Sequence, residues 1–101
     1  MRKYEAMFIL RPDMNEGDKI NIFSQIKETF NKFKIKINNA DIWSEKRKLY
    51  FELSIKAKGA KFSEGLYYLV DFEALPDDIQ KISAAFKLNE DILRLLITLK
   101  E

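Results

Sequence analysis

The groups in this chain that could do chemistry are carboxylates and cations. Two sets of neighbouring acids, Asp71 with Glu73 and Asp77 with Asp78, have the composition of an acid–base or metal-binding pair. The sequence contains no His and no Cys, which excludes imidazole bases, thiol nucleophiles and nearly all zinc chemistry. It also has no glycine-rich phosphate loop, so helix capping and surface charge explain the acids better than catalysis. We therefore predict a protein that is not an enzyme, with no metal, no cofactor and no small-molecule substrate.

The cations offer a different chemistry, because clustered Lys and Arg side chains bind nucleic-acid phosphates. They gather at the start of the chain (Arg2, Lys3), in Lys46-Arg47-Lys48, and in a small-residue segment that contains Lys56 and Lys58. Each cluster also has a plain explanation: a solvated terminus, lysines that protect a strand edge, and a solvated loop. The net charge is only +2, so any binding of RNA must depend on local clustering.

Length and composition favour one folded domain over residues 1–101. The chain is 47% hydrophobic and 34% charged, which is enough apolar material for a compact core. No apolar run approaches the roughly 20 residues that a membrane-spanning helix needs, so we expect no membrane partner.

The alternation of apolar residues predicts a central first strand from Lys3 to Arg11. Tyr4, Ala6, Phe8 and Leu10 share one parity, whereas Glu5, Met7 and Ile9 share the other. Because both faces carry apolar side chains, this strand is expected inside the sheet and not at its edge.

The remaining elements follow from periodicity, capping residues and turn signals. A helix should begin after an Asn15 N-cap, and a bulge at Asn38-Asn39 should bend the second strand. The expected elements are a helix to about Phe33, a strand from Ile35 to Ile55, a loop at Lys56–Lys61, a strand at Leu66–Ala74, a helix from Pro76 to Leu88-Asn89, and a strand at Leu93–Leu99 whose reverse face carries Ile92, Arg94, Leu96 and Thr98.

Two strand-helix-strand units in one small chain predict an α+β fold of the ferredoxin-like split βαβ type (βαββαβ). Each helix has a single apolar stripe, so both can cover one face of a four-stranded antiparallel sheet. Right-handed crossovers place the first and third strands at the centre. The core should then contain Phe8, Phe30, Val70, Phe86 and Leu95.

The uncovered face of this sheet would carry aliphatic side chains. Met7 and Ile9 of the first strand stand where base-stacking domains place aromatic residues, and Leu69 and Leu96 share their face. An aliphatic surface of this kind is typical of a protein-docking face. Incidental exposure of apolar residues is an equally plain explanation.

Several separated blocks of the sequence resemble the bacterial small-subunit ribosomal protein six family. They cover nearly the whole chain in matching order. The blocks are Arg2-Lys3-Tyr4-Glu5, Leu10-Arg11-Pro12, Asp41-Ile42-Trp43 with Lys46-Arg47 and Tyr50, Tyr67-Tyr68, Phe72-Glu73-Ala74-x-Pro76, and Phe86-Lys87-Leu88-Asn89-Glu90-x-Ile92-Leu93-Arg94.

The resemblance implies a structural protein of the small ribosomal subunit, cytoplasmic and within the ribosome. It implies binding to the central domain of small-subunit ribosomal RNA together with small-subunit ribosomal protein eighteen. The sheet edge and the open face both remain possible docking sites. The residues expected to bind RNA are Arg2, Lys3, Lys46, Arg47, Lys56, Lys58 and Arg94. Those expected at the partner-protein interface are Met7, Ile9, Trp43, Tyr50, Leu69 and Leu96. The alternative is a free-standing ferredoxin-like protein-interaction module without a dedicated RNA role.

Overall fold

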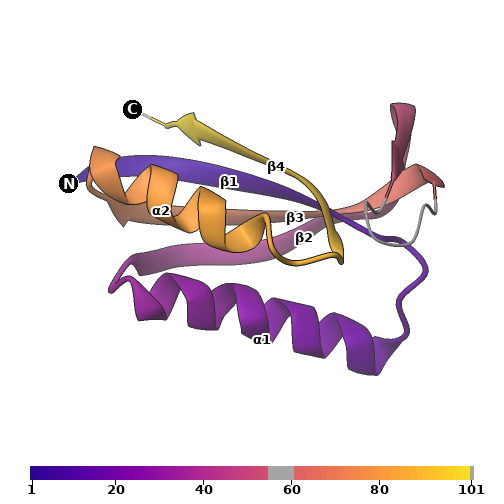
Figure 1. Cartoon of the computed structure of the whole chain (residues 1–101), viewed down its shortest axis with the longest axis horizontal. Helices are drawn as coiled ribbons and strands as arrows, with labels where there is room; N and C mark the ends of the chain where they lie inside the picture. The colour runs from indigo at the N-terminus through magenta and orange to yellow at the C-terminus, as the bar shows by residue number, and fades with distance from the viewer. Residues whose placement is uncertain (55–60, 101) are drawn as a thin grey trace.

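The computed structural model describes the backbone over residues 1–54 and 61–100, and the side chains over 1–44 and 64–100. Four strands and two helices follow one another in the predicted order (Figure 1). They are β1 (Arg2–Leu10), α1 (Glu16–Lys32), β2 (Lys36–Ser54), β3 (Lys61–Ala74), α2 (Pro76–Phe86) and β4 (Ile92–Leu99).

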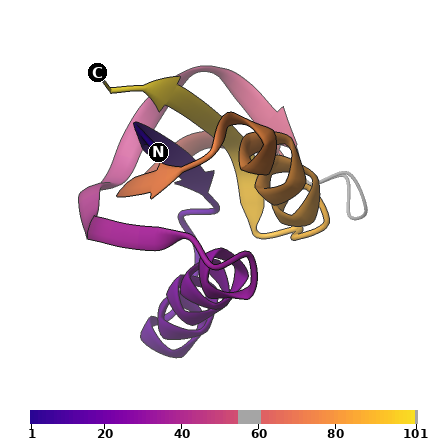
Figure 2. The same ribbon diagram turned by 90° about the vertical axis from the view of Figure 1, so that its left-hand side faces the viewer.

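The strands form one antiparallel sheet in the order β2-β3-β1-β4. This is the ferredoxin-like arrangement predicted from the sequence, with β1 and β3 at the centre. In the end-on view, α1 and α2 lie on the same side of the twisted sheet (Figure 2). The opposite side of β1, β3 and β4 carries neither helix, so this side is called the open face below.

Alternate residues of the central strands form the core beneath the helices. Tyr4, Ala6, Phe8 and Leu10 of β1 are all buried in one cluster with the alternate residues of β3 from Leu66 to Ala74. Phe8 lies edge-on to Phe86 of α2, with ring centroids 4.8 Å apart. The five residues predicted to share a core all pack in or against this cluster.

Helix α1 is capped at both ends by local hydrogen bonds. The Asn15 side chain accepts a bond from the Asp18 amide at 2.8 Å, so the predicted N-cap is confirmed. At the other end, the backbone amide of Lys34 donates to the backbone carbonyl of Asn31, and the backbone amide of Ile35 donates to the backbone carbonyl of Phe30. This bond pair is a Schellman motif, which needs a left-handed residue after the cap.

Lys34 is that left-handed residue, with φ at 57°. Glycine usually fills this position, because a Cβ atom crowds the backbone there. The turn nevertheless holds Ile35 in the core, where it packs into the same cluster as Phe30. Lys34 therefore occupies a position where its side chain costs conformational energy.

The start of β3 and the placement of the Ile92 side chain differ from the prediction. Strand β3 begins at Lys61, five residues before Leu66 and inside the predicted loop, because it continues to pair with β2 there. The rest of that predicted loop, residues 56–60, lies outside the described residues. At β4 the register shifts between Ile9 and Leu10, so Ile92 pairs with Leu10 and packs against the core and not on the reverse face. The predicted bulge near Asn38 is present as a register shift between Ile37 and Asn39.

Within the described part of the chain, neither helix is long and apolar enough to cross a membrane.

Replacing Phe30 with alanine should destabilise the protein by about 3–5 kcal/mol, because its fully buried ring contacts three other aromatic residues. Denaturant melts measure this loss. Ile20→Ala on the same helix is the control, since Ile20 is 65% exposed and should change stability by less than about 0.5 kcal/mol. Equal losses for the two variants would mean that the helix faces the sheet differently.

Lys34→Gly should stabilise the fold by about 0.5–1 kcal/mol, since glycine adopts the left-handed conformation without a Cβ clash. Equilibrium unfolding in urea measures the gain. Lys34→Ala removes the same charge but keeps the Cβ atom, so it should give no such gain. A gain of equal size in Lys34→Ala would assign the effect to charge and not to the backbone.

Candidate functional site

The register of the sheet lines up the predicted partner-binding residues on the open face. Met7 pairs with Leu69 on one side and with Leu96 on the other, so the three side chains form one row across β3, β1 and β4. The next row places Ile9 between Tyr67 and Arg94. Three elements far apart in the sequence therefore build one surface.

The residues of this surface differ in how much of each side chain is exposed to solvent. Leu96 is 43% exposed and Trp43 is 50% exposed, whereas Met7 and Leu69 are half-buried. Ile9 is only 5% exposed, so it supports the surface more than it offers contact area. Trp43 meets Tyr67 edge to face with ring centroids 5.4 Å apart. This contact extends the apolar surface towards β2.

An acidic row lies beside the apolar row. Glu5 pairs with Asp71 across β1 and β3, on the same face as Met7. Asp71 Oδ2 accepts a hydrogen bond from Lys100 Nζ at 2.9 Å, while its buried Oδ1 accepts none from the described residues. The hydrogen bond with Asp71 raises the pKa of Lys100 above its ordinary value. One member of the predicted carboxylate pair is therefore bound by the end of the chain itself.

The predicted RNA-binding residues do not gather at one place. Arg2 and Lys3 are exposed at the start of β1, beside the end of β3. Arg94 is exposed on β4 opposite Ile9, towards the other end of the sheet.

The other predicted site residues lie in or beyond the β2–β3 hairpin. The backbones of Lys46, Arg47 and Tyr50 belong to β2, and Arg47 pairs with Gly65, but their side chains lie outside the described residues. Lys56 and Lys58 lie outside the described residues altogether.

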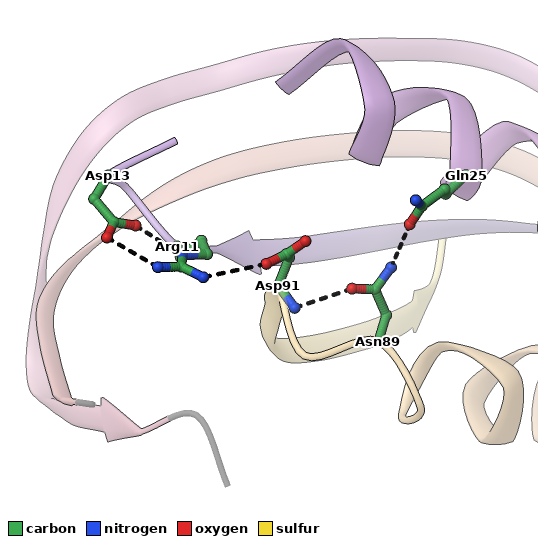
Figure 3. Close-up of polar contacts among 5 residues, drawn as sticks. All are labelled: Arg11, Asp13, Gln25, Asn89 and Asp91. Carbon is green, nitrogen blue, oxygen red and sulfur yellow. Dashed lines mark hydrogen bonds and ion pairs between the residues drawn. The ribbon is translucent and has the colours of Figure 1, made fainter. Parts of the chain in front are cut away.

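A polar cluster at the far end of the sheet joins the β1–α1 loop, the α2–β4 loop and helix α1 (Figure 3). Arg11 donates to both carboxylate oxygens of Asp13 at 2.8 and 3.0 Å, and contacts Asp91 at 3.4 Å. These carboxylates raise the pKa of the Arg11 guanidinium, with the Asp13 hydrogen bond as the largest cause. Asn89 accepts from the Asp91 amide and donates to Gln25 of α1. Arg11 thus ties the β1–α1 loop to the α2–β4 loop.

Sequence reasoning did not assign a role to Arg11, although it belongs to the Leu10-Arg11-Pro12 block. Asp13 is close to Arg11 in the sequence, but Asp91 is 80 residues away. The sequence alone therefore does not indicate that the two carboxylates share this cation. Because two carboxylates already bind its guanidinium, Arg11 is a structural cation and not an exposed phosphate ligand.

The second carboxylate pair serves a helix start. Asp77 and Asp78 lie in the first turn of α2, where negative charge favours the helix dipole. Among the described residues, no three acids, His or Cys gather closely enough to hold a metal ion. A cleft of about 310 Å³ lies between α1 and α2, but the Gln25 and Asn89 amides in its wall bond to each other.

The family model for ribosomal protein S6 matches residues 3–98 of this chain. The chain belongs to the ribosomal protein S6 family. Among its relatives, the small ribosomal subunit protein bS6 of Caldanaerobacter subterraneus is 33% identical, over 96% of this chain and 95% of the relative. The bS6 protein of Clostridium beijerinckii is 36% identical over the same shares. The crystal structure of 30S ribosomal protein S6 from Thermotoga maritima superimposes with a TM-score of 0.80 at 26% identity, over 98% of this chain and 87% of that one.

Membership in the S6 family settles the broad class of this protein. It is a protein of the small ribosomal subunit, located in the cytoplasm within the ribosome. Because the relatives are ribosomal proteins and not enzymes, the predicted absence of catalysis agrees with the family. The resemblance found in the sequence blocks is confirmed.

Arg11→Met should destabilise this S6-family protein by about 1–2 kcal/mol, because it leaves Asp13 and Asp91 without their shared cation. Lys27→Met is the control. It removes one positive charge from an exposed position of α1 that has no ion pair within the described residues, so it should cost less than about 0.5 kcal/mol. Thermal melts of both variants compare the two losses. A loss in Arg11→Met no greater than that in Lys27→Met would mean that the ion pairs of Arg11 do not stabilise the fold.

Proposed function

We propose that this protein binds the central domain of small-subunit ribosomal RNA together with small-subunit ribosomal protein eighteen. The observation that carries the proposal is the apolar row of Leu96, Met7 and Leu69 on the face that no helix covers. An exposed apolar row flanked by charged residues suits a protein partner, because burying it removes apolar area from water. The family gives this surface a ribosomal setting.

The acidic and basic side chains lie on different parts of the sheet, so we expect these parts to bind different partners. The acids Glu5 and Asp71 lie next to the apolar row, where they would repel RNA phosphates but favour a basic protein segment. Arg2 and Lys3 lie at the strand ends, where flexible cations reach phosphates with little steric cover. We therefore assign the open face to the partner protein and the periphery to RNA.

The proposed RNA ligands are those expected from the sequence: Arg2, Lys3, Lys46, Arg47, Lys56, Lys58 and Arg94. The proposed partner contacts are Met7, Ile9, Trp43, Tyr50, Leu69 and Leu96. A net charge of +2 is small for a protein that binds RNA alone. The partner would supply the additional cations and contact area that tight binding needs.

The protein alone should bind a central-domain RNA transcript weakly, and protein eighteen should tighten this binding at least about tenfold. A filter-binding titration at fixed salt, with and without the partner, measures both affinities. Leu96→Asn should abolish most of the gain from the partner, because it replaces the exposed apolar side chain at the β4 end of the row.

Leu99→Asn is the control for that variant. Leu99 lies on the same strand with a similar exposure, 47% against 43% for Leu96, but its parity places it on the opposite face, paired with Tyr4. It should keep the full gain from the partner. Equal affinity with and without protein eighteen would reject cooperative binding. An interaction with protein eighteen that persists without any affinity for RNA would favour the free-standing interaction module.

A further inference from the structure

We propose that the turn between α1 and β2, through Lys34 and Lys36 together with Arg2, is a second binding site for the RNA phosphate backbone. The inference rests on the proposed RNA-binding function, and it joins Lys34 and Lys36, which have no role above, to Arg2, which is among the proposed RNA ligands. Lys34, Lys36 and Arg2 are called the basic corner.

The fold brings the basic corner together from two distant segments. Lys36 and Lys3 both pair with Glu73 on β3, and Arg2 pairs with the next residue, Ala74. The starts of β1 and β2 are therefore separated by one strand, a distance of roughly 10 Å between backbones. Figures 1 and 2 show the N-terminus and the α1–β2 turn at the same end of the molecule.

The cations of the basic corner are exposed and carry no ion pair within the described residues. At the opposite end of the molecule, by contrast, the cations are paired with carboxylates. Arg11 is bound by Asp13 and Asp91, and Lys19 is bound by Glu16. Glu73 lies between Lys3 and Lys36 in the register, yet no ion pair joins it to Lys36. Among the described residues, no ion pair neutralises the positive charge of the corner.

The backbone at Lys34 provides an independent reason to assign a role to this side chain. Its φ of 57° is a conformation in which glycine costs less than any residue with a Cβ atom. A lysine that costs conformational energy in the left-handed region indicates that its side chain has a role other than stabilising the fold. The left-handed turn also ends α1 directly before β2, so Lys34 and Lys36 flank the buried Ile35 and project from the turn and the strand start.

RNA is the occupant that the charges favour. The acids of the open face repel phosphate, whereas the corner offers three flexible cations at one end of the sheet, with Lys36 on the open-face parity and Arg2 on the parity of Tyr4. An RNA strand that passes the start of β1 to reach Arg2 would also pass the start of β2. Such contacts are independent of base sequence and act through counterion release.

The experiment measures the salt dependence of RNA affinity for the complex with protein eighteen, using the central-domain transcript. The double variant Lys34→Asn/Lys36→Gln should lower the slope of log affinity against log salt by roughly 0.7–0.9 for each lost phosphate contact. Asn tolerates the left-handed conformation at position 34. The matched control, Lys27→Gln/Lys81→Gln, removes two exposed helix lysines and changes the net charge equally.

An unchanged slope in the control and a reduced slope in the corner variant support the basic corner. Equal slopes in the two double variants would overturn it, since net charge alone would then explain the effect. Lys34→Arg/Lys36→Arg should keep the wild-type slope; a loss as large as in the neutral variant would assign the effect to the fold and reject the site. If the wild-type complex does not bind the transcript, the proposed function fails and the corner fails with it.

Discussion

The structure depends on the burial of one face of a central strand beneath two helices. Strand β1 pairs on both sides, so its alternate residues set the position of β3 and β4 at once. Phe8 stands at the centre of this arrangement, in contact with Phe30 of α1 and Phe86 of α2. Edge-to-face aromatic packing adds to the free energy of apolar burial. The two helices are therefore held on one face, which leaves the other open.

The open face follows from this burial as a geometric consequence. The period of two along β1 that buries Phe8 must turn Met7 to the opposite side. Leu69 and Leu96 reach the same row because the register of the sheet aligns them with Met7. The core and the proposed partner surface are thus two faces of the same strands. A one-residue register slip would destroy both.

Cations have two different roles in this fold, and local partners separate them. Arg11 is held by Asp13 and Asp91, and so it joins loops that are distant in sequence. Arg2 and Lys34 have no carboxylate partner among the described residues, and their charge remains available to an anion. Counting Lys and Arg residues cannot distinguish these roles, because the distinction depends on which acids the fold brings near.

The order of the elements, the ferredoxin-like topology and the core could be predicted from the sequence, since strand parity, helix stripes and caps are local signals, and the separated sequence blocks indicated the family. The register shift that places Ile92 against the core, the near-complete burial of Ile9 and the contact of Arg11 with Asp91 became apparent only in the folded structure. The folded structure also separated Arg94 from Arg2, although both had been assigned to RNA. The physical reason is that sheet register and long-range ion pairs depend on contacts between residues far apart in the chain, which no local pattern encodes.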